Sequence, residues 1–187
     1  MTAEALAAWL LSVMLASVPP GRSKAPKEAV ETAEDGRTRY AEIARELAAV
    51  ALDLEEKPVF GGKLGRERTA ALMLAISHHE SGWRRDVDLG LGASARAEGR
   101  YHCLMQVAVE RGKTTPEGWG ARALTDSRER CFRAALHILQ RAAGSCRAQG
   151  PDAWLRIYAG GACDRGRQAA ERRLGTMRTW LAQYPMR

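Results

Sequence analysis

The sequence is poor in the features that mark several common protein classes. It has no Cys-x-x-Cys pair, which argues against a zinc ribbon or a thioredoxin-type motif. Its N-terminal apolar run is shorter than the about 20 residues that span a bilayer. Aromatic residues make up only 6% of the chain, and no internal repeat or low-complexity tract is present. At 187 residues, 45% hydrophobic and 27% charged, the composition is that of a soluble chain with a single folded core.

Charge is unevenly distributed along the chain. Residues 1–56 carry 6 basic and 10 acidic side chains, a net of −4, whereas residues 57–187 carry 23 and 12, a net of +11. A positive field attracts polyanions such as nucleic acid, anionic lipid or bacterial cell-wall polymer. However, 24 of the 29 basic residues are Arg, which genome composition explains equally well, so charge alone does not choose among these partners.

The four cysteines lie in the second half of the chain, at Cys103, Cys131, Cys146 and Cys163. An even number of scattered cysteines is compatible with two disulfides in an oxidising compartment, and four buried free thiols in a cytosolic protein are the alternative. Three pairings are possible. If Cys131 faces the loop of Cys103, the local choice joins these two residues and leaves Cys146 to pair with Cys163.

The N-terminus bears on the compartment. Residues 5–18 are almost uniformly apolar and are followed by Pro19-Pro20-Gly21, the pattern of a signal-peptide core. Glu4 precedes the run without any Lys or Arg, and no clean A-x-A site follows it. We predict a signal-like or anchor segment at 1–18, with export to the periplasm or the outside of a bacterial cell. Transient membrane contact or anchoring through residues 5–18 stays open.

Apolar periodicity predicts a mainly α domain at 38–187, preceded by a solvated linker at 19–37. Helices are expected from about residue 38 to before Pro58, at 66–80, at 126–144, around 154–158 and at 170–184. The helix at 66–80 is apolar on every side at 70–76 and is therefore expected in the core. Residues 86–107 contain three glycines and predict turns with a small hairpin. We expect a monomer.

Glu80 is the candidate catalytic residue of the sequence. It ends the apolar helix, and Ile76 and Met73 share its face, so helical geometry directs its carboxyl along a buried stripe. Burial disfavours the ionised form of a carboxyl, which is how a Glu keeps a proton near neutral pH and acts as a general acid. A partly exposed helix-terminal Glu is the alternative interpretation.

Three short strings then occur in order: His79-Glu80-Ser81-Gly82-Trp83, Cys103-Leu104-Met105-Gln106-Val107 and Ile157-Tyr158-Ala159-Gly160-Gly161. Together they resemble the catalytic domain of the soluble lytic transglycosylases, relatives of goose-type lysozyme. In that family the strings read Glu-Ser-(Gly/Arg/Asn), Gly-Leu-Met-Gln and Ala-Tyr-Asn-Ala-Gly. The resemblance covers about residues 66–161.

The resemblance implies a lysozyme-like α+β fold that cleaves the β-1,4 bond between N-acetylmuramic acid and N-acetylglucosamine in peptidoglycan strands. Glu80 would be the single acid and base, giving a 1,6-anhydro product without water or cofactor. Ser81 would contact the muramic acid, Met105 and Gln106 would line the sugar groove, and Tyr158 would hydrogen-bond and orient Glu80. No metal is expected.

The sequence departs from the family at two positions. Cys103 stands where the family has Gly, and a disulfide there would preorganise a loop that glycine otherwise lets turn tightly. Ala159 stands where the family has Asn, which removes a polar contact near the substrate. These departures concern efficiency and subsite preference more than the class of reaction.

A hydrolytic lysozyme is an alternative interpretation of the same residues. Two-carboxyl glycosidases separate the carboxyls by about 5 to 5.5 Å when retaining and about 6.5 to 9.5 Å when inverting. Asp86 and Asp88 follow Glu80 closely enough to supply the second carboxyl, although solvation at the surface is the commoner fate of such residues. With no second carboxyl clearly assigned, we favour the mechanism with one carboxyl.

Binding without cleavage is a further class of function to weigh. Adjacent His78 and His79 lie about 100° apart on a helix and cannot share a face as in H-E-x-x-H, which argues against a metal site. Trp154, Tyr158 and Tyr184 fall on apolar stripes, so no specific nucleic-acid binding is expected despite the positive charge. A glycan-binding domain without cleavage is disfavoured because an idle buried carboxylate destabilises the fold.

Overall fold

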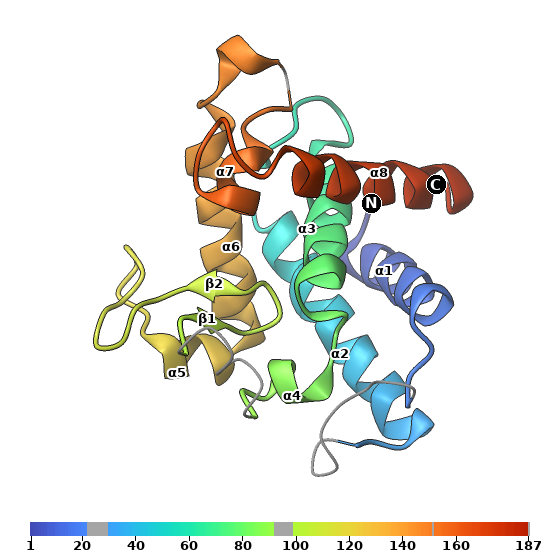
Figure 1. Ribbon diagram of the computed structural model, residues 1–187. Coiled ribbons are helices and arrows are strands. Elements are labelled where there is room, and N and C mark those ends of the chain that lie inside the picture. The colour runs from blue at the N-terminus through green and yellow to red at the C-terminus, as the bar shows by residue number, and fades with distance from the viewer. Residues whose placement is uncertain (22–29, 92–98, 151, 187) are drawn as a thin grey trace.

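The computed structural model describes residues 1–21, 30–91, 99–150 and 152–186, and it is mainly helical (Figure 1). The elements are α1 (Ala3–Ser17), α2 (Ala33–Leu52), α3 (Gly65–Ser81), α4 (Arg85–Asp88), β1 (Tyr101–His102), β2 (Val107–Ala108), α5 (Ala121–Thr125), α6 (Arg128–Ala143), α7 (Leu155–Gly160), α8 (Arg167–Gln183) and a 3₁₀ turn at Arg147–Gln149. The prediction of a mainly α protein is therefore confirmed.

The small hairpin expected within 86–107 is present. Strands β1 and β2 pair antiparallel, with Tyr101 opposite Ala108 and His102 opposite Val107. Residues 92–98 of the predicted segment lie outside the described residues, as do 22–29 of the predicted linker and Pro151. Residues 103–106 form the turn of the hairpin, so the second of the three strings lies in this turn and ends at Val107, the first residue of β2.

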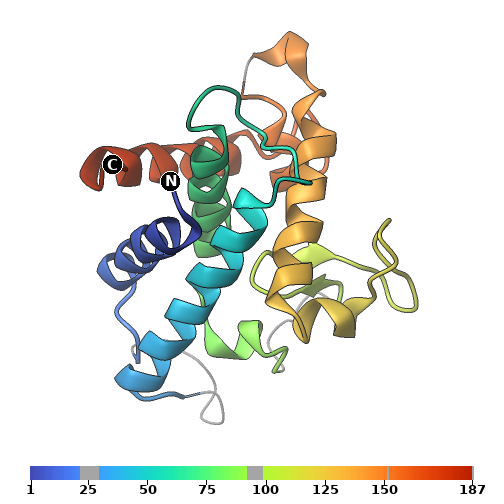
Figure 2. The ribbon, with the colours of Figure 1, turned by 180° about the vertical axis from the view of Figure 1, so that it is seen from behind.

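Helix α3 forms the centre of the molecule, as Figures 1 and 2 show. Every side chain from 70 to 76 is 0% exposed, as expected for a helix surrounded by protein. It packs against α2 along one side, and α8 crosses it on another. Helix α6 packs against α2 and carries the hairpin and α7 on its other flanks. The C-terminal turn of α3 therefore ends among elements from the second half of the chain.

The N-terminal boundary of the domain differs from the prediction. Helix α2 begins at Ala33, because the Thr32 hydroxyl accepts a hydrogen bond from the Asp35 N–H at 3.0 Å and caps the first turn. Residues 33–37, expected in the linker, are therefore helical, and the domain does not begin at 38.

The segment expected to stand apart at 1–18 is instead packed into the core as α1. Leu6, Leu10, Val13 and Met14 are 0% exposed, and Trp9 Nε1 donates to the Tyr184 carbonyl at 2.6 Å. The apolar residues that suggested a signal segment are thus the ones that α1 buries against α2. Among the described helices, none combines the length and apolarity needed to cross a membrane.

Leu10→Ala is expected to lower the free energy of unfolding by about 2 to 5 kcal/mol, because it leaves a cavity where α1 meets the core. Ser12→Ala on the exposed face of α1 is the matched control, with an expected change within about 0.5 kcal/mol. Urea unfolding of the 187-residue chain, its N-terminus checked by mass, measures both. Equal stabilities of the two variants would show that α1 is not part of the folded core.

Candidate active site

A cavity of about 450 Å³ lies where the end of α3 meets the hairpin, α6, α7 and α8. Residues from all three strings line it. The lining residues are Glu80, Tyr101, Gln106, Val107, Ala108, Ile138, Ile157, Tyr158, Ala159, Gly160, Gly161 and Arg173. Segments far apart in the sequence are thus brought to one site by the packing of α3, α6 and α7.

Glu80 reaches this cavity from the last turn of α3. The helix ends because Gly82 adopts a left-handed conformation, with φ of 58°, and its N–H donates to the His78 carbonyl at 2.9 Å. The Glu80 side chain is 22% exposed and forms an ion pair with Arg173 Nη2. The expectation of a largely buried carboxyl at the helix end agrees with this placement, but the carboxylate has a cationic partner that the sequence analysis did not predict.

Arg173 is a residue of the candidate site that sequence reasoning missed. Its side chain is only 7% exposed, and its Nε and Nη1 atoms are buried with no hydrogen-bond partner among the described residues. The signal was present in the sequence, because Arg173 follows Ala170 by three positions and precedes Met177 by four, on the apolar stripe of the last helix. A charged residue on such a stripe needs a buried partner.

Tyr158 does not orient Glu80 as the resemblance implied. Its hydroxyl donates to the Met105 carbonyl at 2.6 Å, so the phenol ties α7 to the turn of the hairpin. Burial, together with the negative charge of Glu80, raises the pKa of Tyr158. The phenol is protonated at neutral pH even at the ordinary pKa of tyrosine, about 10, and its single proton is donated to the Met105 carbonyl.

The two residues expected to line the sugar groove, Met105 and Gln106, lie in different surroundings. Met105 is 0% exposed and belongs to the core, so the prediction of a groove contact is wrong for its side chain. Gln106 does line the cavity, and its amide nitrogen donates to the Cys103 carbonyl at 2.9 Å. The physical reason is the turn itself, because Gln106 has φ of 51° and its side chain folds back over the turn.

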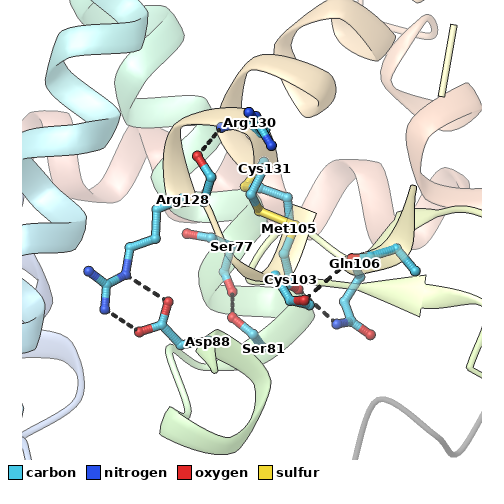
Figure 3. The surroundings of a disulfide bond; sticks show 12 residues. Ser77, Ser81, Asp88, Cys103, Met105, Gln106, Arg128, Arg130 and Cys131 are labelled. Atoms are coloured by element: carbon cyan, nitrogen blue, oxygen red, sulfur yellow. Dashed lines mark hydrogen bonds and ion pairs between the residues drawn. A yellow bond between two sulfur atoms is a disulfide. The ribbon is translucent and has the colours of Figure 1, made fainter. Parts of the chain in front are cut away.

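Ser81 is a structural residue and does not line the cavity. It is buried, its hydroxyl donates to the Ser77 carbonyl at 2.8 Å, and its oxygen accepts from the Trp83 N–H at 3.2 Å (Figure 3). The helical periodicity explains the difference, since Ser81 follows Glu80 by about 100° and faces the protein interior. Contact with a muramic acid in this cavity is therefore not supported for Ser81.

Both disulfides of the local pairing are present, and all four cysteines are used. Cys103–Cys131 joins the hairpin turn to α6, with a Cα separation of 6.0 Å (Figure 3). Cys146–Cys163 closes the segment that carries α7. Cys103 has φ of 58°, so it occupies the left-handed conformation that usually favours glycine. The disulfide thus holds a turn at the position where the resembling family has Gly.

The end of α7 is set by a close approach between two backbones. A Cβ on Gly160 would lie 2.8 Å from the Gly166 nitrogen, a distance at which the chain must move. Gly161 follows as the left-handed cap of α7, with φ of 77°. Glycines in the third string therefore let this wall of the cavity pack against the start of α8.

The aspartates that a two-carboxyl mechanism requires are not at the site. Asp86 is paired with Arg84, and Asp88 accepts from Arg128 Nε at 2.9 Å and Nη2 at 2.8 Å (Figure 3). Their side chains are at most 1% exposed, and neither lines the cavity. Both carboxylates are held in ion pairs because burial of an unpaired charge is costly. The structure thus contradicts the interpretation that used them as catalytic groups.

The histidines next to Glu80 serve packing and hydrogen bonding. His78 contacts Trp83 and Trp180, with ring centroids 5.0 and 5.6 Å apart, and burial lowers its pKa. His79 is exposed, and its Nε2 lies 2.8 Å from the Thr176 hydroxyl. Within the described parts of the chain, no group of three or more His, Cys, Asp or Glu side chains is placed to hold a metal ion.

Comparison with protein-family models, with curated proteins and with solved structures found no match to this chain. Its function is therefore inferred from the cavity itself. Among the described residues that line the cavity, Glu80 is the only carboxylate and Arg173 the only cation. Tyr101, which is 40% exposed, adds an aromatic ring at the rim, and Gln106 adds an amide. This arrangement offers one acid and base beside hydrogen-bonding and aromatic groups.

Replacing both Cys103 and Cys131 by Ala is expected to lower the free energy of unfolding by about 2 to 4 kcal/mol, because the crosslink is lost. Cys103→Gly with Cys131→Ala should recover about 1 kcal/mol of this loss, since glycine adopts the left-handed conformation without strain. Urea unfolding compares the two double variants. A glycine variant no more stable than the alanine variant would contradict the role assigned to the backbone at 103.

Gly160→Ala is expected to lower the free energy of unfolding by about 1 to 3 kcal/mol, because the new methyl group forces α7 away from Gly166. Gly175→Ala, inside α8 with no atom within 4 Å of the added Cβ, should be neutral or stabilising by up to about 1 kcal/mol. Thermal unfolding of both variants tests the packing of this wall. Equal midpoints would show that the approach at Gly160 is not tight in solution.

Proposed function

We propose that the protein is a lysozyme-like enzyme that cleaves the β-1,4 bond between N-acetylmuramic acid and N-acetylglucosamine in peptidoglycan. The observation that carries this proposal is the meeting of the three strings around one cavity with Glu80 at its side. A chance resemblance of three short strings gives no reason for them to converge in space. The mainly α architecture with one small hairpin is compatible with a lysozyme-like fold.

In the proposed reaction Glu80 is first protonated and donates its proton to the glycosidic oxygen. The bond from muramic C1 to that oxygen breaks, and the N-acetylglucosamine leaves with a new hydroxyl group. The resulting carboxylate of Glu80 accepts the proton of the muramic C6 hydroxyl, whose oxygen forms a bond to C1. The product is a 1,6-anhydro end, Glu80 regains its proton, and no water is consumed.

Three features of the site support the proposal, and the first of them favours a reaction with one carboxyl group. Glu80 is the sole carboxylate among the described residues lining the cavity, and Asp86 and Asp88 are committed to ion pairs elsewhere. The exposed ring of Tyr101 offers a surface on which the apolar face of a sugar can pack. The amide of Gln106 and the phenol of Tyr158 offer polar contacts within the same cavity.

The disulfides and the charge of the protein agree with the same proposal. Two disulfides are typical of an oxidising compartment, such as the periplasm or the outside of a cell, where peptidoglycan is found. The excess of basic residues over 57–187 favours association with anionic wall polymers.

Glu80→Gln is expected to lower the release of muropeptides from purified peptidoglycan by about 100-fold or more, because the general acid is lost. Glu171→Gln, an exposed residue of α8 outside the cavity, is the matched control and should release fragments at the wild-type rate. Mass spectrometry of the fragments tests the chemistry. Fragments one water lighter than reducing ends indicate the proposed intramolecular reaction.

Three other outcomes are possible; the first would contradict the intramolecular mechanism alone, and the other two would contradict the proposed function. Reducing ends would show hydrolysis, with water in place of the C6 hydroxyl. Retention on peptidoglycan without release by either the wild type or Glu171→Gln would favour a glycan-binding domain. A salt-sensitive shift of DNA in place of both would favour nucleic-acid binding as the explanation of the positive charge.

A further inference from the structure

Arg173 carries buried N–H groups that no described part of the protein uses. A guanidinium has five N–H groups, and burial of such a group is unfavourable unless hydrogen bonds replace those to water. In Arg173 only Nη2 contacts an acceptor, a carboxyl oxygen of Glu80, while the buried Nε and Nη1 have no partner among the described residues. The side chain is 7% exposed and belongs to the wall of the cavity. Buried donors without acceptors at this place point to a ligand.

Two other polar side chains of the cavity wall already have acceptors. The Tyr158 hydroxyl donates its proton to the Met105 carbonyl at 2.6 Å. The amide nitrogen of Gln106 donates to the Cys103 carbonyl at 2.9 Å. Both bonds hold the hairpin turn. Arg173 therefore differs from these two side chains, because two of its three nitrogen atoms remain for a ligand.

The kind of acceptor follows from what the guanidinium already holds. Arg173 has an acidic partner in Glu80, so a neutral oxygen suits the remaining N–H groups better than a second acidic group beside the first. A guanidinium has no acceptor atom, so it matches an amide carbonyl, which only accepts, better than a hydroxyl group, which also donates. The cavity of about 450 Å³ lies within the range of small-molecule sites, about 300 to 1,000 Å³.

We propose that Arg173 binds an amide carbonyl oxygen of the glycan, so that this site selects amide-bearing sugars. The inference deepens the proposed function and rests on it. Peptidoglycan presents such a carbonyl in two places, the acetamido group of each sugar and the peptide attached to muramic acid. Because Nε and Nη1 are buried in the free protein, the guanidinium turns toward the cavity when the ligand enters.

The contact is measured directly with ¹⁵N-labelled arginine side chains. The Nε–H signal of Arg173 is identified by its absence in Arg173→Lys. The wild type is titrated with the tetramer of N-acetylglucosamine, with N-acetylmuramoyl dipeptide and with cellotetraose, which has hydroxyl groups in place of the acetamido groups. The signal should shift with an amide-bearing ligand and stay in place with cellotetraose.

The ligands separate the two sources of the carbonyl. A shift with the tetramer assigns the contact to an acetamido group. A shift with the muramoyl dipeptide alone assigns it to the muramic acid with its peptide. An amide-bearing ligand that binds without moving the Arg173 signal overturns the inference, and so does a wild type that binds neither of the two amide-bearing ligands.

Arg173→Met removes the N–H groups at similar volume. Calorimetric titration should show an affinity for the amide-bearing ligand that is about 10- to 100-fold lower, the loss expected for a hydrogen bond to a charged group. Any affinity for cellotetraose should not change. An undiminished affinity, or an equal loss for both ligands, overturns the inference.

Arg178→Gln is the matched control, because Arg178 lies on the same helix in an exposed ion pair with Asp152. It should leave the affinities for all three ligands unchanged. Arg173→Leu repeats the calorimetry if Arg173→Met does not fold. The NMR titration of the wild type needs neither variant.

Failure of this inference differs from failure of the proposed function. If the wild type releases muropeptides while its Arg173 signal ignores every amide-bearing ligand, the inference is overturned and the proposed function stands. If an amide-bearing ligand shifts the signal and no muropeptide is released, the inference stands and the proposed cleavage is overturned. The protein would then be a glycan-binding domain.

Discussion

The complete burial of α3 is the constraint on which the rest of the structure depends. A helix with no exposed side chain from 70 to 76 has only its ends available for function. Its C-terminal end is fixed by the left-handed Gly82 and by the buried hydroxyl of Ser81, which holds the last turn to Ser77. Glu80 is therefore presented from the end of a helix whose preceding turns are fully buried, and its position follows from the core packing.

The ion pairs formed by buried side chains differ in their surroundings: one joins helices, and another lines the cavity. Asp88 joins α4 to α6 through Arg128 and lies near Arg39 of α2, at 3.5 Å, so this cluster fastens three helices. The pair of Glu80 and Arg173 instead opens onto a cavity. The first kind of pair is compatible with structure alone, whereas the second leaves part of an arginine unsatisfied and places a titratable group where a ligand can reach it.

The walls of the cavity are built from backbone that deviates from regular structure. Cys103 and Gln106 adopt left-handed conformations in the hairpin turn, and Gly160 packs directly on the backbone of Gly166. Such conformations persist only where the surroundings hold them. The two disulfides and the bond from Tyr158 to the Met105 carbonyl supply that support, so the crosslinks lie where the backbone most needs them.

Local patterns in the sequence were sufficient to predict helices α2, α3, α6, α7 and α8, the hairpin, the core position of residues 70–76 and the carboxyl of Glu80 at a helix end. These features depend on periodicity, on glycine stops and on neighbours along the chain. Other features depended on which elements cross the end of α3. These are the burial of Ser81 and Met105 in the core, the hydrogen bond from the Tyr158 hydroxyl to the Met105 carbonyl, and the ion pair of Glu80 with Arg173. The burial of α1 likewise depended on tertiary packing, because the same apolar sequence is compatible with a signal segment and with a helix that packs against α2. Long-range packing decides such contacts, since each partner lies tens of residues away and no local spacing encodes the distance.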